Sequence, residues 1–471
     1  MKALFAVSEC APFVKTGGLA DVAGALPLAL ARLGVEARVL MPAYPAVAAL
    51  GGEDLGGFDG ARLRGVRAEG IDLLLYDDPA LFARPGGPYL DEGGRDWPDN
   101  AERFAALSRA AAHLAREGVG DWRPDVLHLH DWQTALAAVY LRARPGGPPC
   151  LLTIHNIAFQ GVFPPDLPPR LGLPADGFTP SGYEFWGQVG FLKGGLTAAD
   201  RITTVSPGYA RELTSPAFGM GLEGVIAERR AEVEGVLNGV DDAVWNPAAD
   251  PHIPAAYDAD TLPRRAVNRE ALAQRFGLAR SPDAPLFGVV SRLTRQKGLD
   301  MLLDALPRLL DRGASLAVIG SGDADLERAF RGAASAHPGR VGVVIGYSEP
   351  LSHLLQAGAD CLLVPSRFEP CGLTQLYALR YGALPLVART GGLGDTVIDA
   401  NPAAMQAGCA TGFQFSPIAE GPLGDAIDRA CDAFADVALW ETMQRNAMAQ
   451  DVSWTVSAAR YADIYRELCA A

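Results

Sequence analysis

The chain reads ALFAVS at residues 3–8 and KTGGLAD at residues 15–21, and these two stretches decide the fold. The first is an unbroken apolar run, which is typical of a β-strand buried on both faces. The glycine pair in the second allows a tight turn, and the residues from Leu19 onward predict a helix. A strand, a glycine turn and a helix in this order predict the beginning of a parallel βα fold.

The same alternation continues along the whole chain. Between helix-like stretches the sequence predicts strands at residues 37–41, 71–76, 125–130, 150–155 and 201–205, and then at 286–291, 315–320, 341–346, 360–365 and 384–388. These runs are continuously apolar, as expected for sheets that have helices on both faces. The sequence therefore predicts the α/β class, with two doubly wound Rossmann-like domains.

The chain is too long for one ordinary hydrophobic core, because it has 471 residues and a mass of 49.6 kDa. The stretch NPAADPHIP at residues 246–254 is rich in proline and lacks periodicity, so we predict that it links two domains. The predicted domains are residues 1–245 and 246–452, followed by a C-terminal segment at 453–471. Ligands of such folds bind beyond the carboxyl ends of the strands, and an interdomain cleft is the expected site.

Net charge limits the range of partners. It is −14 at pH 7, so long-range repulsion argues against nucleic acid or an anionic membrane as a partner. The seven cysteines are scattered without a Cys-x-x-Cys pair, which favours reduced thiols over disulfides or structural zinc. The N-terminal run is too short for a signal peptide, and no apolar run reaches membrane-spanning length. We therefore expect a cytoplasmic protein that captures any anionic ligand in a local basic pocket.

Lysine is rare: only Lys2, Lys15, Lys193 and Lys297 occur, and the other cations are arginine. A lysine kept in an arginine-rich chain indicates a place where the compact ammonium is preferred to the planar guanidinium. Lys15 and Lys297 each stand in a glycine-containing turn, in opposite halves of the chain. We interpret the two as binding one anionic ligand, most simply a phosphate. Chance retention of each lysine is the alternative.

The turn at residues 15–21 has the features of an anion site. Gly17 and Gly18 let the backbone approach a ligand, and the following helix offers unpaired N–H groups and a favourable dipole. Lys15 precedes the glycines and Asp21 follows them. Ordinary tight turns use the same glycines, so the lysine and the aspartate carry the functional interpretation.

A second basic turn, RLTRQKG at residues 292–298, follows a predicted strand. Arg292 is a bidentate cation and Lys297 is a point charge. Together they suit a diphosphate whose negative charge grows during a reaction. A solvated basic loop is the alternative interpretation.

Residues 367–375 read RFEPCGLTQ and follow the predicted strand at 360–365. Glu369 can accept hydrogen bonds from sugar hydroxyls, and the amides after Pro370 open a helix N-terminus. Cys371 has no neighbouring base, so we expect its backbone rather than its thiol to contact a ligand.

Three histidines lie near the ends of two predicted strands. His155 ends the strand at 150–155 and precedes an aromatic loop, which suits a ligand site and equally suits hydrogen-bonded packing. His128 and His130 alternate along the strand before Asp131. No third ligand accompanies them at metal-binding spacing, so no metal site is predicted.

Taken together, these residues give the chain a close resemblance to the bacterial glycogen synthases and plant starch synthases that use ADP-glucose. The matching stretches are KTGGLADV, HDW, HNIAFQG, LNGVD, SRLTRQKG, FEPCGLTQLYALRYG and RTGGLGDTV, in family order. The resemblance implies a GT-B fold, in which two Rossmann-like domains face each other across a deep cleft and the C-terminal helix crosses back to the first. It also implies transfer of glucose from ADP-glucose to the non-reducing end of an α-1,4-glucan such as glycogen, with retention of configuration.

The resemblance further implies roles for individual residues. Those expected to be catalytic are His155, Arg292, Lys297 and Glu369. Those expected to bind the donor are Lys15, Gly17, Gly18, Asp21, Asn238, Tyr347, Cys371, Gly372, Leu373 and Thr374, with Tyr347 stacking on adenine. Asp131 is expected near a sugar. No cofactor and no metal ion is expected, because Lys297, Arg292 and helix amides would stabilise the departing ADP as Mg²⁺ does elsewhere.

Two positions depart from the family pattern. Gln133 stands where the family usually has histidine, which puts an acceptor role there in doubt. Tyr377 stands where retaining GT-B enzymes often carry a second glutamate, so ribose recognition at that point is not assumed. A UDP-sugar transferase, a 2-epimerase and a non-catalytic glucan-binding module remain alternative functions.

Overall fold

The computed structural model describes residues 1–279 and 281–470, and the chain divides into two units. Unit 1 comprises Met1–Asn238 and the C-terminal helix α20 (Trp454–Ala470), and unit 2 comprises Gly239–Ser453. Each unit is built on one large, mainly parallel sheet. The predicted α/β class with two Rossmann-like domains is therefore confirmed.

The sheet of unit 1 has the strand order β12-β11-β7-β6-β1-β2-β5-β4-β3. The run from β12 to β5 is parallel throughout, and β4 and β3 add an antiparallel edge. The strands are β1 (Lys2–Ala6), β2 (Glu36–Pro42), β3 (Glu53–Phe58), β4 (Ala61–Ala68), β5 (Ile71–Asp77), β6 (Val126–His130), β7 (Cys150–Ile154), β11 (Arg201–Thr204) and β12 (Val233–Gly235). Strand order reverses between β1 and β6, so the loops after these two strands diverge.

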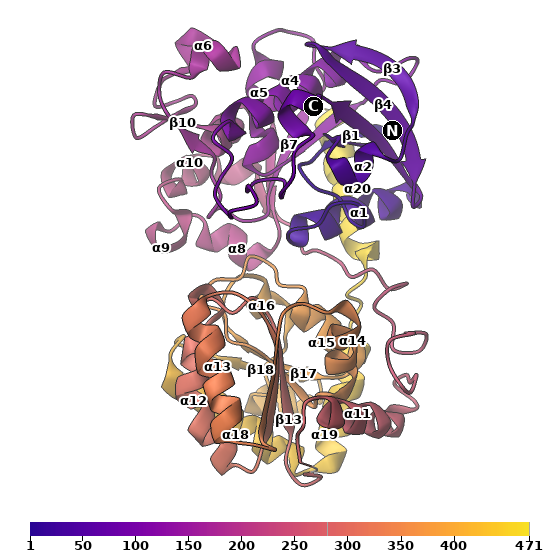
Figure 1. Cartoon of the computed structure of the whole chain (residues 1–471), viewed down its shortest axis with the longest axis vertical. Coiled ribbons are helices and arrows are strands. Elements are labelled where there is room, and N and C mark those ends of the chain that lie inside the picture. The colour runs from indigo at the N-terminus through magenta and orange to yellow at the C-terminus, as the bar shows by residue number, and fades with distance from the viewer. Residues whose placement is uncertain (280, 471) are drawn as a thin grey trace. The chain divides into compact units, whose positions relative to one another are not determined.

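The helices of unit 1 before α20 are α1 (Gly18–Ala31), α2 (Pro45–Ala48), α3 (Pro79–Phe82), α4 (Asn100–Glu117), α5 (Trp132–Arg142), α6 (Pro168–Leu171), α7 (Phe191–Ala198), α8 (Pro207–Glu212), α9 (Pro216–Gly219) and α10 (Glu223–Glu228). A small antiparallel sheet is formed by β8 (Val162–Phe163), β10 (Gln188–Gly190) and β9 (Glu184–Phe185), in that order. Helix α20 contacts α1 and β6 (Figure 1). Its Tyr465 hydroxyl is hydrogen-bonded to His128 Nδ1 at 2.7 Å, so the last helix of the chain packs within the first unit.

The sheet of unit 2 has the strand order β15-β14-β13-β16-β17-β18 and is parallel throughout. Counted from β13, this is the order 3-2-1-4-5-6 of the Rossmann fold, with a reversal between β13 and β16. The strands are β13 (Leu286–Val290), β14 (Ser315–Gly320), β15 (Val341–Ile345), β16 (Cys361–Val364), β17 (Leu384–Ala388) and β18 (Phe413–Phe415).

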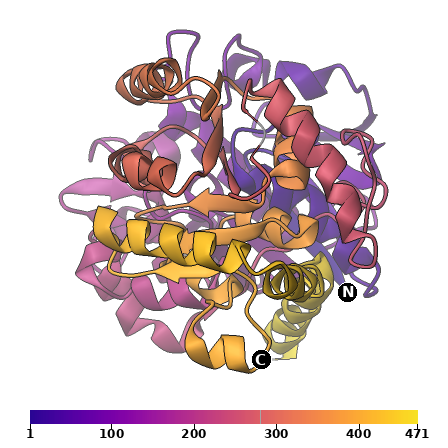
Figure 2. The same cartoon turned by 90° about the horizontal axis from the view of Figure 1, so that it is seen from below.

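Helices cover both faces of the sheet of unit 2. Figure 1 shows α12, α13 and α18 on one face and α11 and α14 on the other, and Figure 2 shows the same arrangement from below. The helices are α11 (Arg265–Arg275), α12 (Leu299–Asp311), α13 (Ala324–Ala336), α14 (Glu349–Gly358), α15 (Thr374–Tyr381), α16 (Gly391–Thr396), α17 (Pro402–Gln406), α18 (Glu420–Phe434) and α19 (Val437–Met448). Every residue of β14 and β17 is buried, which is why their sequences are continuously apolar.

The predicted linker at residues 246–254 is wrong. The segment lies inside unit 2, and the first segment of unit 1 ends at Asn238 rather than at residue 245. Asp250 is 6% exposed, and its Oδ2 accepts a hydrogen bond from the Tyr381 hydroxyl at 2.6 Å and lies 2.8 Å from His353 Nδ1. Proline content and missing periodicity do not distinguish a flexible linker from an irregular segment that buried hydrogen bonds hold in place.

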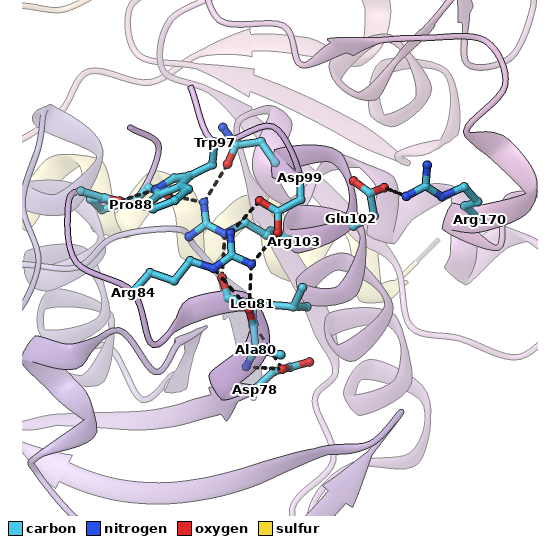
Figure 3. A network of polar contacts seen from close by, with 12 residues as sticks. Asp78, Ala80, Leu81, Arg84, Pro88, Trp97, Asp99, Glu102, Arg103 and Arg170 are labelled. Carbon is cyan, nitrogen blue, oxygen red and sulfur yellow. Dashed lines mark hydrogen bonds and ion pairs between the residues drawn. The ribbon is translucent and has the colours of Figure 1, made fainter. Parts of the chain in front are cut away.

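A buried arginine fixes the segment after β5. Arg103 on α4 is 1% exposed, and its guanidinium donates to the carbonyl oxygens of Leu81 at 2.8 Å and Pro88 at 2.9 Å. Figure 3 shows this guanidinium beside the Arg84–Asp99 ion pair, in which nitrogen and oxygen lie 2.5 Å apart. Buried carbonyl groups need donors, so Arg103 holds this part of the backbone in place.

Replacing Arg103 with methionine keeps an apolar stem but leaves the carbonyls of Leu81 and Pro88 without their donor. Each unsatisfied buried group costs about 1–3 kcal/mol, so we expect unit 1 to lose about 2–6 kcal/mol of stability from the two carbonyls. The loss is measured as a lower melting temperature and as faster amide hydrogen exchange in this segment. Arg170→Met is the matched control, because Arg170 pairs with Glu102 at an exposed position, where ion pairs contribute about 0–1 kcal/mol. Equal melting temperatures for the two variants would contradict the role of Arg103.

Candidate functional site

In unit 2 the predicted site residues follow the carboxyl ends of β13, β15 and β16. β13 is followed by the short 3-10 turn Arg295–Lys297, and β16 by the loop that leads into α15. β13 and β16 are hydrogen-bonded neighbours at the reversal of strand order. Loops diverge at such a switch point and leave room for a ligand. The sequence-predicted residues of the second half are therefore brought to one edge of one sheet.

Lys297 and Glu369 form an ion pair at this edge. Lys297 Nζ lies 2.5 Å from Glu369 Oε2, and the Ser366 hydroxyl donates to the same oxygen at 2.9 Å. The side chains of the pair are 18% and 10% exposed, and both line a small pocket with Gly372 and Thr374. An ammonium has three N–H donors, so a lysine bound to Glu369 can also bind an anion in the pocket.

A glycine turn supports the loop that carries Glu369. A Cβ atom on Gly391 would lie 2.1 Å from the Glu369 carbonyl oxygen, and one on Gly392 would lie 2.4 Å from that of Cys371. Only glycine permits this approach of two backbones. The RTGGLGDTV stretch therefore positions the amides of Cys371, Gly372 and Leu373, which precede α15 and its first residue, Thr374.

Arg292 and Tyr347 are exposed side chains at the same edge. Arg292 follows β13 by two residues, and Tyr347, which is 69% exposed, follows β15 by two residues. A hydrogen bond from the Gly346 N–H to the Gly320 carbonyl at 2.9 Å joins the loops after β15 and β14. Their expected roles toward phosphate and adenine stay predictions.

In unit 1 the Lys15 turn follows β1, one of the two strands at the reversal of order. Lys15 Nζ lies 2.7 Å from Asp21 Oδ1, and these side chains are 45% and 28% exposed. Gly17 precedes helix α1, which begins at Gly18. A Cβ atom on Gly17 would meet nothing nearer than Glu9 Oε1 at 3.9 Å. The turn thus presents backbone amides at a helix start, with a cation beside them.

Glu9 is a site residue that the sequence analysis missed. It is 3% exposed, and its Oε2 accepts a hydrogen bond from the Thr16 N–H at 2.5 Å, which holds the glycine turn. Burial raises the pKa of this carboxyl. An acidic residue directly after the strand predicted at residues 3–8 was the available signal. Tyr89 was missed too, and its hydroxyl is hydrogen-bonded to Ser8 Oγ at 2.7 Å.

Asp131 and His155 meet at the carboxyl ends of β6 and β7. Asp131 Oδ1 accepts a hydrogen bond from the His155 N–H at 2.7 Å, and His155 Nε2 lies 2.9 Å from His130 Nδ1. Burial raises the pKa of Asp131 to about 7 and lowers the pKa of His155 to about 3. His155 is therefore a neutral imidazole at physiological pH, while Asp131 is partly protonated.

The remaining positions singled out from the sequence are Asn238, Gln133 and Tyr377. Asn238 is 8% exposed, and its Oδ1 accepts no hydrogen bond from any residue that the structure describes. Gln133 lies in the first turn of α5, also buried. Tyr377 stacks on Trp245 with ring centroids 3.8 Å apart, so packing occupies the position of the absent glutamate.

Across residues 1–279 and 281–470, no three His, Cys, Asp or Glu side chains are grouped so that they could hold a metal ion. None of the helices in that described part of the chain combines the length and hydropathy of a membrane span. His128 instead bonds to Tyr465 and to Thr153 Oγ1, each at 2.7 Å.

Known families and proteins match nearly all of the chain. The family described as starch synthase catalytic domain matches residues 2–228, and glycosyl transferases group 1 matches residues 271–431. Glycogen synthase of Roseobacter denitrificans is 57% identical over 99% of both chains. Glycogen synthase 1 of Rhizobium meliloti is 53% identical over 100% of both chains.

Solved structures also match nearly the whole chain. The catalytic domain of starch synthase IV from Arabidopsis thaliana, bound to ADP and acarbose, matches with a TM-score of 0.87 at 30% identity, over 100% of this chain and 99% of its own. Sucrose-phosphate synthase from Thermosynechococcus elongatus matches with a TM-score of 0.59 at 18% identity, over 100% of this chain and 99% of its own. The second match supports the fold alone.

The neutral state of His155 can be measured by nitrogen NMR of the imidazole, with the signal assigned by its loss in His155→Gln. Because burial lowers the pKa to about 3, we expect the signal of the neutral ring throughout the range from pH 6.5 down toward 3. The unfolded chain takes up the proton first as the pH falls below 6.5, so the stability contributed by the neutral ring is complete above 6.5 and is lost toward 3. A titration midpoint near the ordinary value would contradict this assignment.

Proposed function

Because the chain belongs to the glycogen synthase family, we propose that it transfers glucose from ADP-glucose to the non-reducing end of an α-1,4-glucan and releases ADP. The resemblance predicted from the motifs is confirmed by full-length relatives. ADP in the Arabidopsis structure supports an adenosine diphosphate donor. The observation that carries the proposal is the Lys297–Glu369 pair at the switch point of unit 2.

Departure of ADP is the step that needs stabilisation. The bond between the anomeric carbon and the phosphate oxygen breaks, and its electron pair stays on that oxygen. Lys297, Arg292 and the N–H groups before α15 are assigned to this charge. Each charge-assisted hydrogen bond contributes about 1.5–3 kcal/mol. Contacts that strengthen only in the transition state raise the rate directly, and in this proposal they replace a metal ion.

Glu369 is assigned to the hydroxyls of the transferred glucose. Its Oε2 accepts hydrogen bonds from Lys297 and Ser366, which fixes the carboxylate and reduces its reactivity as a nucleophile. The acceptor hydroxyl then attacks from the face that ADP leaves, and its proton passes to the departing phosphate oxygen. This course retains the configuration of the anomeric carbon.

Residues of unit 1 are assigned to the diphosphate and the sugars. Lys15, Gly17 and Gly18 would bind the diphosphate and glucose, with Asp21 nearby. The neutral imidazole of His155 would accept or donate one hydrogen bond beside the reacting sugar without adding positive charge. Partly protonated Asp131 can donate to a sugar oxygen as well as accept from a hydroxyl.

The remaining assignments concern the adenine ring, Asn238, and the location, class and partners of the enzyme. Tyr347 would stack on adenine, and the buried amide of Asn238 would bind the donor, which supplies the partner that its oxygen lacks among the described residues. We place the enzyme in the cytoplasm and in the GT-B class. The net charge of −14 supports the absence of nucleic-acid and membrane partners.

A donor panel tests the proposed reaction. ADP-glucose and UDP-glucose are each supplied with glycogen in the presence of EDTA, and release of the nucleoside diphosphate is measured. We expect turnover with ADP-glucose that EDTA does not reduce. Faster turnover with UDP-glucose would favour another nucleotide-sugar enzyme, and glucan binding without ADP release would favour a binding module.

Lys297→Ala should lower kcat/KM for ADP-glucose by more than about tenfold, because one charge-assisted contact to the leaving group is lost. Arg295→Ala is the matched control: it removes a cation two residues away in the same turn, from an exposed side chain. Lys297→Arg should not restore the wild-type rate, because the planar guanidinium does not replace the compact ammonium. Near-normal turnover by folded Lys297→Ala would remove the leaving-group role.

A further inference from the structure

An exposed tryptophan stands at the tip of a hairpin in unit 1. Phe185 pairs with Gln188, so β9 and β10 are joined by the two-residue turn of Trp186 and Gly187. Both turn residues have positive φ, 52° and 77°, as a type I′ turn requires. Asparagine or glycine adopts this conformation at little cost, whereas a bulky aromatic residue is strained there. Trp186 is also 80% exposed, so packing does not explain its presence.

Trp186 belongs to a continuous surface that we call the aromatic platform: Phe159, Gln160, Trp186, Met220 and Gly221. The Gln160 side-chain amide donates to the Met220 carbonyl at 3.1 Å, and a Cβ atom on Gly221 would lie 3.3 Å from Trp186 Nε1. Phe159 is 55% exposed and Met220 is 45% exposed. Within the described ranges, 1–279 and 281–470, the exposed aromatic side chains are Phe159, Trp186 and Tyr347, so most of them gather here.

Helix α7 holds both the hairpin that carries Trp186 and the loop that carries Phe159 and Gln160. The buried ammonium of Lys193 donates to the Glu184 carbonyl at the base of the hairpin. The Leu192 N–H donates to the Gln160 carbonyl at 3.0 Å, and the adjoining Phe191 N–H donates to the Gly161 carbonyl at 2.9 Å. A surface held by one helix from two sides is preorganised for binding, because little of it must be ordered by a ligand.

The chemistry of the platform favours a neutral polyhydroxylated ligand. None of its five residues is charged, and the neighbouring Glu223 carboxylate is engaged by the Gly221 N–H at 2.8 Å. An anionic ligand would find no cation among these residues. The apolar faces of sugar rings can lie on Phe159 and Trp186, and the Gln160 amide can bond to hydroxyls between them.

The platform is continuous with the loop that carries His155. That loop turns at the Asn156 carbonyl, which accepts from the Phe159 N–H at 3.2 Å. A Cβ atom on Gly161 would lie 2.3 Å from the ring of Trp132, the neighbour of Asp131. The surface therefore runs from the assigned sugar residues of unit 1 outward to the hairpin tip.

We propose that the aromatic platform binds the α-1,4-glucan acceptor several glucose units away from its reacting end. The inference rests on the proposed function for the identity of the glucan. It assigns to Trp186 a binding role that the strained, exposed position otherwise lacks. Stacking on the platform lowers the KM for long acceptors and has no part in bond breaking.

The test removes the aromatic rings of Trp186 and Phe159 with substitutions that fit the backbone conformation. Trp186→Asn suits the positive φ, so the fold should melt at the same temperature or higher, and Phe159→Ser removes the second ring. We expect this double variant to raise the KM for glycogen by about tenfold, equivalent to about 1.4 kcal/mol, and to abolish retardation in glycogen-containing native gels. The KM for ADP-glucose should change by less than about twofold. Trp186→Tyr should keep most of the affinity.

Leu33→Ala is the control, because Leu33 is another exposed apolar side chain of unit 1. An unchanged KM for glycogen in the double variant would overturn the proposal. So would a change of sedimentation coefficient at unchanged KM, because it would assign the platform to a contact between copies of this chain. Retardation of the wild type by glycogen without ADP release from any donor would instead reject the proposed reaction and leave the platform in place.

Discussion

The reversal of strand order in a parallel sheet is the constraint on which the sites of this protein depend. In unit 2 the chain leaves β13 toward β14 and leaves β16 toward β17, so no crossover covers the edge between their carboxyl ends. Lys297 and Glu369 come from these two loops and meet at 2.5 Å. In unit 1 the reversal lies between β1 and β6, and the Lys15 turn and Asp131 follow those strands. The topology of each sheet alone therefore brings residues that are far apart in the sequence to the same sheet edge.

The charges at the two sheet edges are balanced in different ways. In unit 2 the buried carboxylate of Glu369 is compensated by an ammonium, and the attraction between the two charges offsets part of the cost of desolvating them. In unit 1 burial raises the pKa of Glu9 and brings that of Asp131 to about 7, so burial there favours the protonated form of both carboxyl groups. In a chain with a net charge of −14, Lys15 and Lys297 thus place one ammonium group at each of these sheet edges.

The parallel strands could be predicted from the sequence, whereas the irregular segments could not. Continuous apolar runs such as ALFAVS can be recognised as strands, because both faces of each strand are buried. The edge hairpin of β3 and β4 was missed because β3 has no buried residue and β4 is buried over only part of its length, and β18 was missed because it has three residues. The linker was misplaced because the hydrogen bonds of Asp250 join residues that lie about a hundred positions apart, which composition does not reveal. Glu9 was missed because its contact with the glycine turn depends on a tertiary hydrogen bond from the Thr16 N–H, which the sequence does not reveal.

The buried Lys193 shows a second reason why a lysine is kept in this arginine-rich chain. Lys193 is 7% exposed, and its ammonium donates to the Glu184 carbonyl. A guanidinium would need a wider space and would bring two more N–H donors than an ammonium into a buried position. Lys193 is thus kept for packing at the base of the hairpin, as Lys297 is kept for pairing inside a pocket. Both lysines place a positive charge in a confined space. The two positions differ in function. At these two positions lysine retention indicates confinement of the charge, and the surroundings decide whether that charge meets a ligand or the backbone.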